Sequence, residues 1–321
     1  MILIIISGVY SLSESHLIQQ FRVSGNPQNS WASITEPNIN SPDITKMETN
    51  TSKISNNRET RIDKFGTKEL YPTKVDGKEW FSKWDNGKSR AFFNEESDPY
   101  DNEFKLRGDG KIVIDGNGLA SLSGSAPRMF IYDESKHHKY NNVEITFYGK
   151  RLAETETLSW NGLIAGARSK HLDNYVCNGQ TYYGRMTYDG RMTFEKELFH
   201  GHGNDAFYPN NQNPNRTTWN GTSHTMPKNV WVGFKFVVRT VDNGTHVNLQ
   251  LYRDMTDGKN GGSWEKLLEF KDDGNWAVTA EGGICNKIPN NMILLEPGFV
   301  FIRNDEVEEV HYKKFTIREI T

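Results

Sequence analysis

The sequence predicts an all-β protein, an antiparallel sandwich of two sheets in a jelly-roll arrangement, preceded by a disordered N-terminal segment. From about residue 90 the chain repeats short runs of alternating apolar and polar residues, each ended by Gly, Asn or Asp. The composition favours sheets and turns, with 28 Gly, 17 Phe, 13 Tyr and 8 Trp in 321 residues. No helical pattern separates the runs, and roughly a dozen strands without helices are typical of a sandwich or barrel.

Three regions are expected along the chain. Residues 1–21 open with an apolar run that is consistent with a truncated secretion signal or with an ordinary buried strand. Residues 22–70 are rich in Asn, Ser, Thr and Pro and poor in large apolar groups, which predicts a disordered linker. Residues 71–321 form the predicted jelly-roll domain.

Charge and cysteine content limit the class of protein. The net charge of −3 gives no reason to expect a nucleic-acid partner, and no segment is apolar enough to predict a membrane span. Cys177 and Cys285 are the two cysteines, and they can pair only if the fold brings them together. With the N-terminal run, these features lead us to expect an extracellular or cell-surface protein.

Alternation places the strands. Val143, Ile145 and Phe147 share one face of a strand. Two further strands alternate in the same way, over 232–239 and 247–252. Additional strands are predicted at 111–115, 127–132, 160–167, 181–187, 191–199, 264–270, 299–303 and 310–319.

One hairpin can be placed in register. If Tyr188-Asp189-Gly190 is a three-residue loop, with Gly190 in the left-handed conformation, every cross-strand pair matches in polarity. A two-residue loop would mix the two faces, and a slip of one residue is costly in a half-buried sheet. The predicted pairs are Met186 with Met192, Arg185 with Thr193, Tyr183 with Glu195, and Thr181 with Glu197.

In this register one face of the hairpin is polar and the other apolar. The apolar face carries Met186, Met192, Phe194 and Leu198, which predicts core. The polar face carries Tyr183, Arg185, Arg191, Glu195 and Glu197, with His200 just beyond. Such a strip either lines a glycan groove or is a solvated outer face with weak ion pairs.

Two chemistries suit the strip. Glu195 and Glu197, at i and i+2, project from one face and are candidate catalytic acids for glycoside hydrolysis. Elimination from a uronic acid polymer instead needs a Tyr or His to move protons, which Tyr183 and His200 would supply. In either case Arg185 and Arg191 are candidate substrate-binding residues.

Residues outside the strip are weaker candidates. Lys235, Gln250 and Tyr252, on the polar faces of their strands, are further predicted substrate-binding residues. No spacing indicates a metal centre or a required cofactor. A structural calcium ion is an alternative to simple turn formation for four aspartates, namely Asp254, Asp257, Asp272 and Asp273.

The alternating strands, the run 194–198 and the closing run 312–320 resemble the concanavalin-A-like lectin/glucanase superfamily, over about residues 75–321. Within it the hairpin is distantly similar to alginate-lyase-type jelly rolls, where Glu197-Leu198 matches part of an Arg-x-Glu-Leu-Arg strand. Phe199 stands where the second Arg belongs, and no Gln-x-His strand is present. The laminarinase-type Glu-x-Asp-x-Glu is also absent.

From the sequence we therefore expect a jelly-roll protein whose partner is a polysaccharide. It cleaves that polymer by β-elimination or by hydrolysis. The alternative is a non-catalytic carbohydrate-binding or adhesion module.

Overall fold

The structure is a computed structural model that describes residues 61–132, 138–171, 175–200, 202–206, 219, 224–278, 285 and 287–321. The region expected at 1–21 and residues 22–60 of the linker expected at 22–70 lie outside the described residues. Helical structure in the described ranges is limited to three short 3-10 helices: η1 (Val176–Asn178), η2 (Asp242–Gly244) and η3 (Lys259–Gly261). No helix among these residues is long and apolar enough to cross a membrane.

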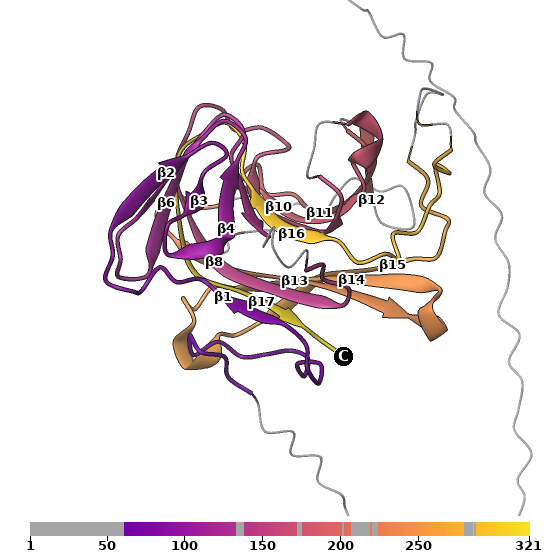
Figure 1. Cartoon of the computed structure of the whole chain (residues 1–321), viewed down its shortest axis with the longest axis horizontal. Coiled ribbons are helices and arrows are strands. Elements are labelled where there is room, and N and C mark those ends of the chain that lie inside the picture. Colours follow the sequence, from indigo (N-terminus) through magenta and orange to yellow (C-terminus); the bar gives the residue numbers. More distant parts are fainter. Residues whose placement is uncertain are drawn as a thin grey trace, which may run out of the picture. The chain divides into compact units, whose positions relative to one another are not determined.

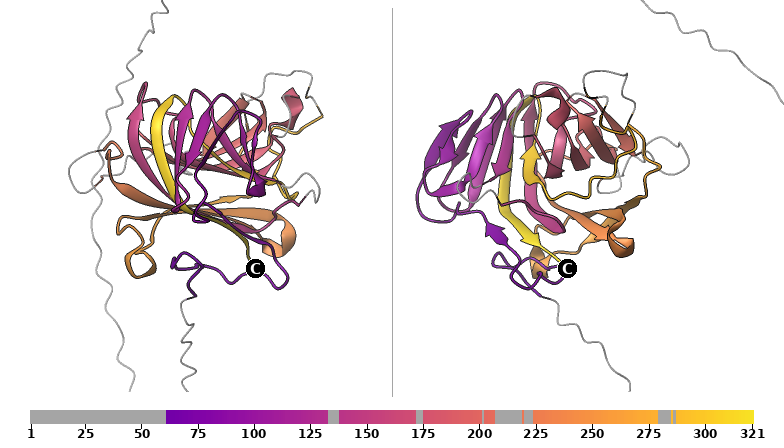
Figure 2. Two further views of the ribbon diagram at one scale, coloured as in Figure 1. Left: turned by 60° about the vertical axis from the view of Figure 1, so that its left-hand side comes forward. Right: turned by 45° about the vertical axis from the view of Figure 1, so that its right-hand side comes forward.

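The described strands form two antiparallel sheets, which lie in two layers (Figures 1 and 2). The first sheet has nine strands: β1 (Glu79–Phe81), β2 (Arg90–Phe93), β5 (Lys111–Ile114), β6 (Leu119–Gly124), β8 (Val143–Glu154), β13 (Trp231–Val241), β14 (His246–Asp254), β15 (Glu265–Asp272) and β17 (Val307–Glu319). The second sheet has eight: β3 (Ser97–Asp98), β4 (Asp101–Arg107), β7 (Arg128–Ile131), β9 (Gly162–Ser169), β10 (Thr181–Thr187), β11 (Met192–Phe199), β12 (His202–Ala206) and β16 (Phe299–Arg303).

The strand order joins distant parts of the sequence. The first sheet runs β15-β14-β13-β8-β17-β6-β5-β2, with β1 paired to β17, and the second runs β12-β11-β10-β9-β16-β7-β4-β3. The C-terminal strand β17 thus lies in the middle of the first sheet, and β16 lies in the middle of the second. The predicted antiparallel two-sheet sandwich is confirmed.

Apolar side chains fill the space between the layers. Phe194 of the second sheet stacks on Phe236 of the first, with ring centroids 6.0 Å apart. A polar contact also crosses the core, because Lys196 Nζ lies 2.9 Å from Asp272 Oδ2 and both side chains are fully buried. Tyr182 Oη donates to the same carboxylate oxygen at 2.6 Å. The hydrophobic effect and this buried polar network therefore hold the two sheets together.

The predicted hairpin register is confirmed residue by residue. β10 pairs with β11 so that Met186 faces Met192, Tyr183 faces Glu195 and Thr181 faces Glu197. Gly190 closes the three-residue loop with a φ of 91°. A Cβ atom at this position would lie 1.3 Å from the carbonyl oxygen of His224, so both conformation and space require glycine.

The packed body begins by residue 61, earlier than the composition predicts. Residues 61–78 run along the outer face of the first sheet, where the backbone amides of Leu70 and Tyr71 donate to the Glu144 carboxylate. Arg318 and Lys235 also bind this carboxylate, at 3.0 and 2.9 Å. The segment is thus held by a buried charged cluster rather than by large apolar groups.

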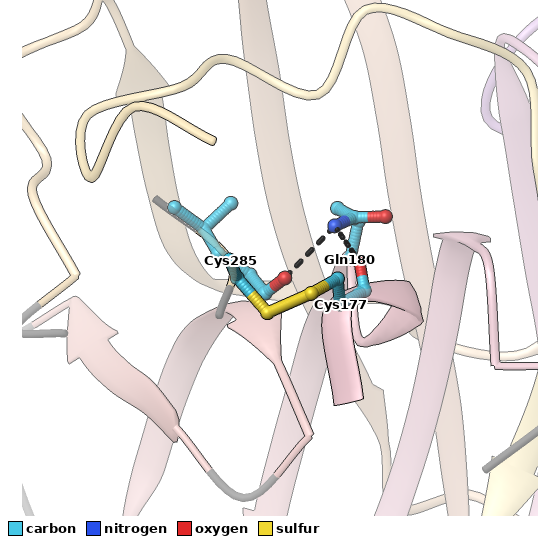
Figure 3. Close-up of a disulfide and its surroundings, with 4 residues drawn as sticks. Cys177, Gln180 and Cys285 are labelled. Atoms are coloured by element: carbon cyan, nitrogen blue, oxygen red, sulfur yellow. Dashed lines mark hydrogen bonds between the residues drawn. A yellow bond between two sulfur atoms is a disulfide. The ribbon is translucent and has the colours of Figure 1, made fainter. Parts of the chain in front are cut away.

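Cys177 and Cys285 form a disulfide bond with a Cα–Cα distance of 5.4 Å (Figure 3). It ties η1 to a turn 108 residues further along the chain. Gln180 beside it donates to the carbonyl oxygens of Cys177 and Leu198, at 2.6 and 2.8 Å. The bond therefore anchors the chain where η1 meets the end of β11.

Candidate functional site

A cavity of about 680 Å³ opens on the outer face of the second sheet. In Figure 1, β4 and β12 rise on either side of β16 and β10, so that the sheet curves around this face. The lining side chains, which we call the groove, come from five strands and the adjoining turns: Asn94, Glu95, Arg107, Gly108, Ala126, Arg128, Phe130, His171, Tyr183, Glu195, Glu197, His200, Phe301 and Arg303. Tyr183, Glu195, Glu197 and His200, the four predicted catalytic residues, are all among them.

The floor of the groove holds a compact hydrogen-bonded cluster. Tyr183 Oη donates to Glu197 Oε2 at 2.8 Å, and His171 Nε2 lies 3.0 Å from the same oxygen. The tyrosine hydroxyl is 3.4 Å from His171 Nε2. Tyr183 is 1% exposed and Glu197 5%, so a phenol, an imidazole and a carboxylate meet in an almost dry setting.

Burial and mutual contacts shift the pKa values of Tyr183 and Glu197 in opposite directions. Burial raises the pKa of Tyr183 well above its usual value, and the neighbouring Glu197 charge raises it further. Burial alone would also raise the pKa of Glu197. The hydrogen bonds and charges of His171, Tyr183 and Arg303 outweigh it and hold that pKa below its ordinary range. At neutral pH the tyrosine is therefore a proton donor and the glutamate an anion.

His171 reaches the groove because β9 contains a bulge. Three steps along β9 oppose two along β16, from Phe301 opposite Gly166 to Phe299 opposite Ser169. Arg168 takes the extra position with a φ of 53°, and its side chain binds the Leu294 carbonyl. The bulge reverses the alternation, so odd-numbered positions face the groove beyond it.

Two further predicted groove residues behave differently. Arg185 donates to Glu195 Oε2 at 2.9 Å and to the Ser159 carbonyl, and it supports the groove wall through this carboxylate. Arg191 lies at the hairpin turn, where it pairs with Asp189 at 2.7 Å. Neither arginine is among the lining residues.

Three arginines also line the groove, each with an acidic neighbour. Arg303 and Arg128 both contact Asp305, at 2.7 and 2.9 Å. Arg107 contacts Glu95 at 3.1 Å. About a fifth of each arginine side chain is exposed, and all three side chains line the cavity.

Aromatic rings complete the groove. Phe130 of β7 and Phe301 of β16 stack with their centroids 4.7 Å apart, and Tyr183 meets Phe301 edge to face at 5.8 Å. Phe301 lies directly over Gly166, where a Cβ atom would come within 2.6 Å of its ring. The glycine therefore lets this ring lie flat on the sheet.

The groove also contains a group of metal-ligand type. One donor atom from each of His171, Glu197 and His200 lies within 4.8 Å of the others. Within the described ranges this is the only set of three or more His, Cys, Asp or Glu residues so arranged.

Lys235, Gln250 and Tyr252 do not join the groove. They lie on β13 and β14 of the first sheet, on its outer face, beneath residues 61–78. Lys235 is buried against Glu144, and Gln250 accepts a hydrogen bond from Tyr71 Oη at 2.7 Å. Their polar side chains help to hold residues 61–78 on the sheet.

The four aspartates considered for calcium have protein partners. Asp254 accepts hydrogen bonds from Thr256, Gly258 and Ser263 through its two oxygens, which organises the turn that follows β14. Asp272 pairs with Lys196. The two others bind locally, Asp257 to Lys313 and Asp273 to the Asn275 amide. Asp254 and Asp273 thus organise turns, and Asp257 and Asp272 form salt bridges, which fits these roles better than a calcium cage.

Sequence reasoning missed His171, the three groove arginines and the two phenylalanines. Alternation does place Phe301 and Arg303 on one face of the predicted strand 299–303, which was a usable signal. Nothing in the local pattern indicates that this strand lies two places from β10, because the pairing brings together residues more than 100 positions apart.

No family model and no curated protein matches the sequence. Among solved structures, the exoplasmic/lumenal domain of VIP36 in its Ca2+-bound form aligns with 75% of this chain and 92% of its own, at 8% identity and a TM-score of 0.37. Peanut lectin aligns with 73% and 99%, at 11% identity and a TM-score of 0.32. Winged bean acidic lectin, complexed with methyl-α-D-galactose, aligns with 72% and 98%, at 9% identity and a TM-score of 0.35.

Proposed function

We propose that this chain binds a polysaccharide in the groove of the second sheet. The observation that carries the proposal is the chemistry of the lining, where guanidinium, carboxylate and imidazole groups surround stacked aromatic rings. Sugar hydroxyls need directional donors and acceptors, and the apolar faces of sugar rings pack on aromatic side chains. A volume of about 680 Å³ also lies within the usual range for small-ligand sites, about 300–1,000 Å³.

An acidic polymer suits the lining best. Arg107, Arg128 and Arg303 line the cavity, and guanidinium groups bind carboxylates, often bidentately. Each already has an acidic neighbour, so a uronic acid carboxylate would join a charge network rather than meet an isolated cation. These lining residues are sufficient for a non-catalytic module that binds such a polymer.

A second candidate function is cleavage of the same polymer by β-elimination. The observation that favours it is the contact of Tyr183 with both Glu197 and His171. In this reaction a base removes the proton beside the uronic carboxyl group, and an acid protonates the departing glycosidic oxygen. Tyr183 holds its proton at neutral pH and would serve as the acid, while His171 would accept the other proton.

Hydrolysis fits the groove less well. It needs a carboxylic acid that stays protonated near neutral pH. The pKa of Glu197 is held low by its partners despite burial, and Glu195 is bound by Arg185. Glu197 is therefore an anion that organises the groove rather than a proton donor, and Glu195 is already engaged by Arg185.

The disulfide bond bears on the compartment in which the protein acts. A disulfide bond such as Cys177–Cys285 forms and persists in oxidising compartments, which supports an extracellular or cell-surface site of action. Polysaccharides of the cell surface and matrix are accessible there. A structural calcium ion is part of neither candidate function.

The test is a panel of neutral and uronic acid polymers. Binding without products supports the non-catalytic module, and ultraviolet absorbance from new unsaturated uronic ends supports elimination. Reducing ends without that absorbance would support hydrolysis instead. A chain that binds no member of the panel and cleaves none would contradict the proposal.

A further inference from the structure

His171, Glu197 and His200 come from different parts of the second sheet but converge at one point of the groove floor. His171 follows β9, Glu197 is in β11, and His200 follows the end of β11. The two imidazole rings lie 4.4 Å apart at an angle of 86°, and His171 Nε2 is 3.0 Å from Glu197 Oε2. We propose that these three residues bind a divalent transition-metal ion of the zinc type, with an open coordination position towards the groove.

The donor set matches this ion. Zinc is held by imidazole nitrogens and carboxylate oxygens at about 2.0–2.2 Å, and sites with three protein ligands keep a fourth position for water or a substrate atom. Ligands at those distances in a tetrahedron lie about 3.3 Å from each other. His171 and Glu197 are already close to that spacing, at 3.0 Å.

His200 is the ligand that has to move. The donor atoms lie within 4.8 Å of one another, so the widest gap must close by about 1.5 Å to reach the tetrahedral spacing. His200 is partly exposed at a turn, so rotation of its side chain can supply this movement. Glu197 is held within β11, and the backbone of His171 is held by its hydrogen bond to Ser169 Oγ.

Groups around the ligands support them. Tyr183 Oη donates to the Glu197 carboxylate at 2.8 Å, an outer contact of the type that orients a metal-binding carboxylate. The backbone amide of His171 donates to Ser169 Oγ at 3.0 Å. The neighbouring cation Arg303 is paired with Asp305, which reduces its repulsion of a metal ion.

The disulfide supports the third ligand. The backbone amide of His200 donates to the Val176 carbonyl at 2.9 Å, and Val176 begins η1, which contains Cys177. The disulfide bond between Cys177 and Cys285 therefore fixes η1, and η1 in turn fixes the backbone at His200. The ligand that needs side-chain freedom thus has a fixed backbone.

The proposal goes beyond glycan binding and is tested without any glycan. Zinc is titrated calorimetrically into the full-length, untagged chain after treatment with a chelator. We expect one zinc ion per chain, and a visible absorption spectrum of low-symmetry Co2+ when cobalt replaces it. His171→Ala and His200→Ala should each weaken binding more than the roughly 10- to 100-fold typical of losing an outer partner, and Tyr183→Phe should weaken it about 10-fold.

His246→Ala is the matched control, because His246 also contacts a carboxylate, Asp242, at 2.9 Å but lies on the first sheet. This variant should bind zinc as the native chain does. His200→Gln replaces the alanine variant if circular dichroism shows that alanine disturbs the fold. Absence of zinc binding, or binding that survives both groove substitutions, would overturn the metal site and leave the glycan proposal unaffected.

Discussion

Tyr183 and Glu197 bind each other diagonally across the β10–β11 hairpin. The residue directly opposite Tyr183 is Glu195, yet the tyrosine hydroxyl donates to Glu197, 2.8 Å away. Glu195 is bound in turn by Arg185, which is itself opposite Thr193. Diagonal contacts of this kind are within reach of long side chains on a sheet. They leave two differently supported carboxylates side by side in the groove.

Substituting Tyr183 by Phe removes the hydroxyl that binds the Glu197 anion. A hydrogen bond to a charged group contributes about 1.5–3 kcal/mol, so the free energy of unfolding should fall by that amount in urea denaturation. Tyr252→Phe is the control, because that hydroxyl donates to the neutral Gln250 amide at 3.0 Å and its loss should cost about 1 kcal/mol. Equal losses in the two variants would contradict the assigned role of the diagonal contact.

Acid should destabilise the fold partly through Glu197. Its pKa is lower in the folded chain than the ordinary value of 4.5, so the unfolded chain binds the proton more tightly. The resulting stability is fully present above about pH 4.5 and is lost as the pH falls through the folded pKa. In urea titrations from pH 7 to pH 3, Glu197→Gln should lose less stability than the native chain. A parallel decline of both proteins would show that Glu197 does not contribute.

Removing the disulfide should be costly because it closes a long loop. The two cysteines are 108 residues apart, and closing a loop of about 100 residues stabilises a fold by about 4.7 kcal/mol in the chain-entropy account. Cys177→Ser with Cys285→Ser should therefore lower the unfolding free energy by about 4–5 kcal/mol. Adding a reductant to the native chain should have the same effect and should leave the double variant unchanged. A double variant as stable as the native chain would refute this estimate.

Gly166→Ala should disturb the groove from below. The added methyl group would lie 2.6 Å from the Phe301 ring, and overpacking of this kind costs about 1–3 kcal/mol. Adding Phe301→Leu should restore part of that loss, because the smaller side chain makes room for the methyl group. The double-mutant cycle measures this coupling by denaturation. Strict additivity of the two substitutions would show that the residues do not contact each other.

The hairpin register was predictable because its determinants are local. The polarity of β10 and β11 alternates along most of their length, with an exception at Lys196, and Gly190 marks the loop, so the register with a three-residue loop keeps both faces consistent. The same rule could not predict that His171 faces the groove. An alternation continued through β9 assigns it to the core face, and only the bulge at Arg168 turns it into the groove.

The first sheet shows a second limit of sequence reasoning. The polar positions of β13 and β14, among them Lys235 and Gln250, predict an accessible face. Residues 61–78 cover that face through hydrogen bonds to side chains, including the contact of Tyr71 with Gln250. A polar composition predicts poor core formation, but it does not reveal that buried charges such as Glu144 can hold a segment in place.

The glycan proposal is tested most directly by calorimetric titration of one uronic acid oligosaccharide into matched cation variants. Arg107 lines the groove, whereas Lys271 pairs with Asp242 on the far sheet at 3.0 Å. We expect Arg107→Gln to weaken binding about 10-fold or more, the equivalent of losing a charged hydrogen bond of about 1.5 kcal/mol, and Lys271→Gln to leave it unchanged. Equal affinities in the two variants, or a loss confined to Lys271→Gln, would place the ligand elsewhere and contradict the proposed groove.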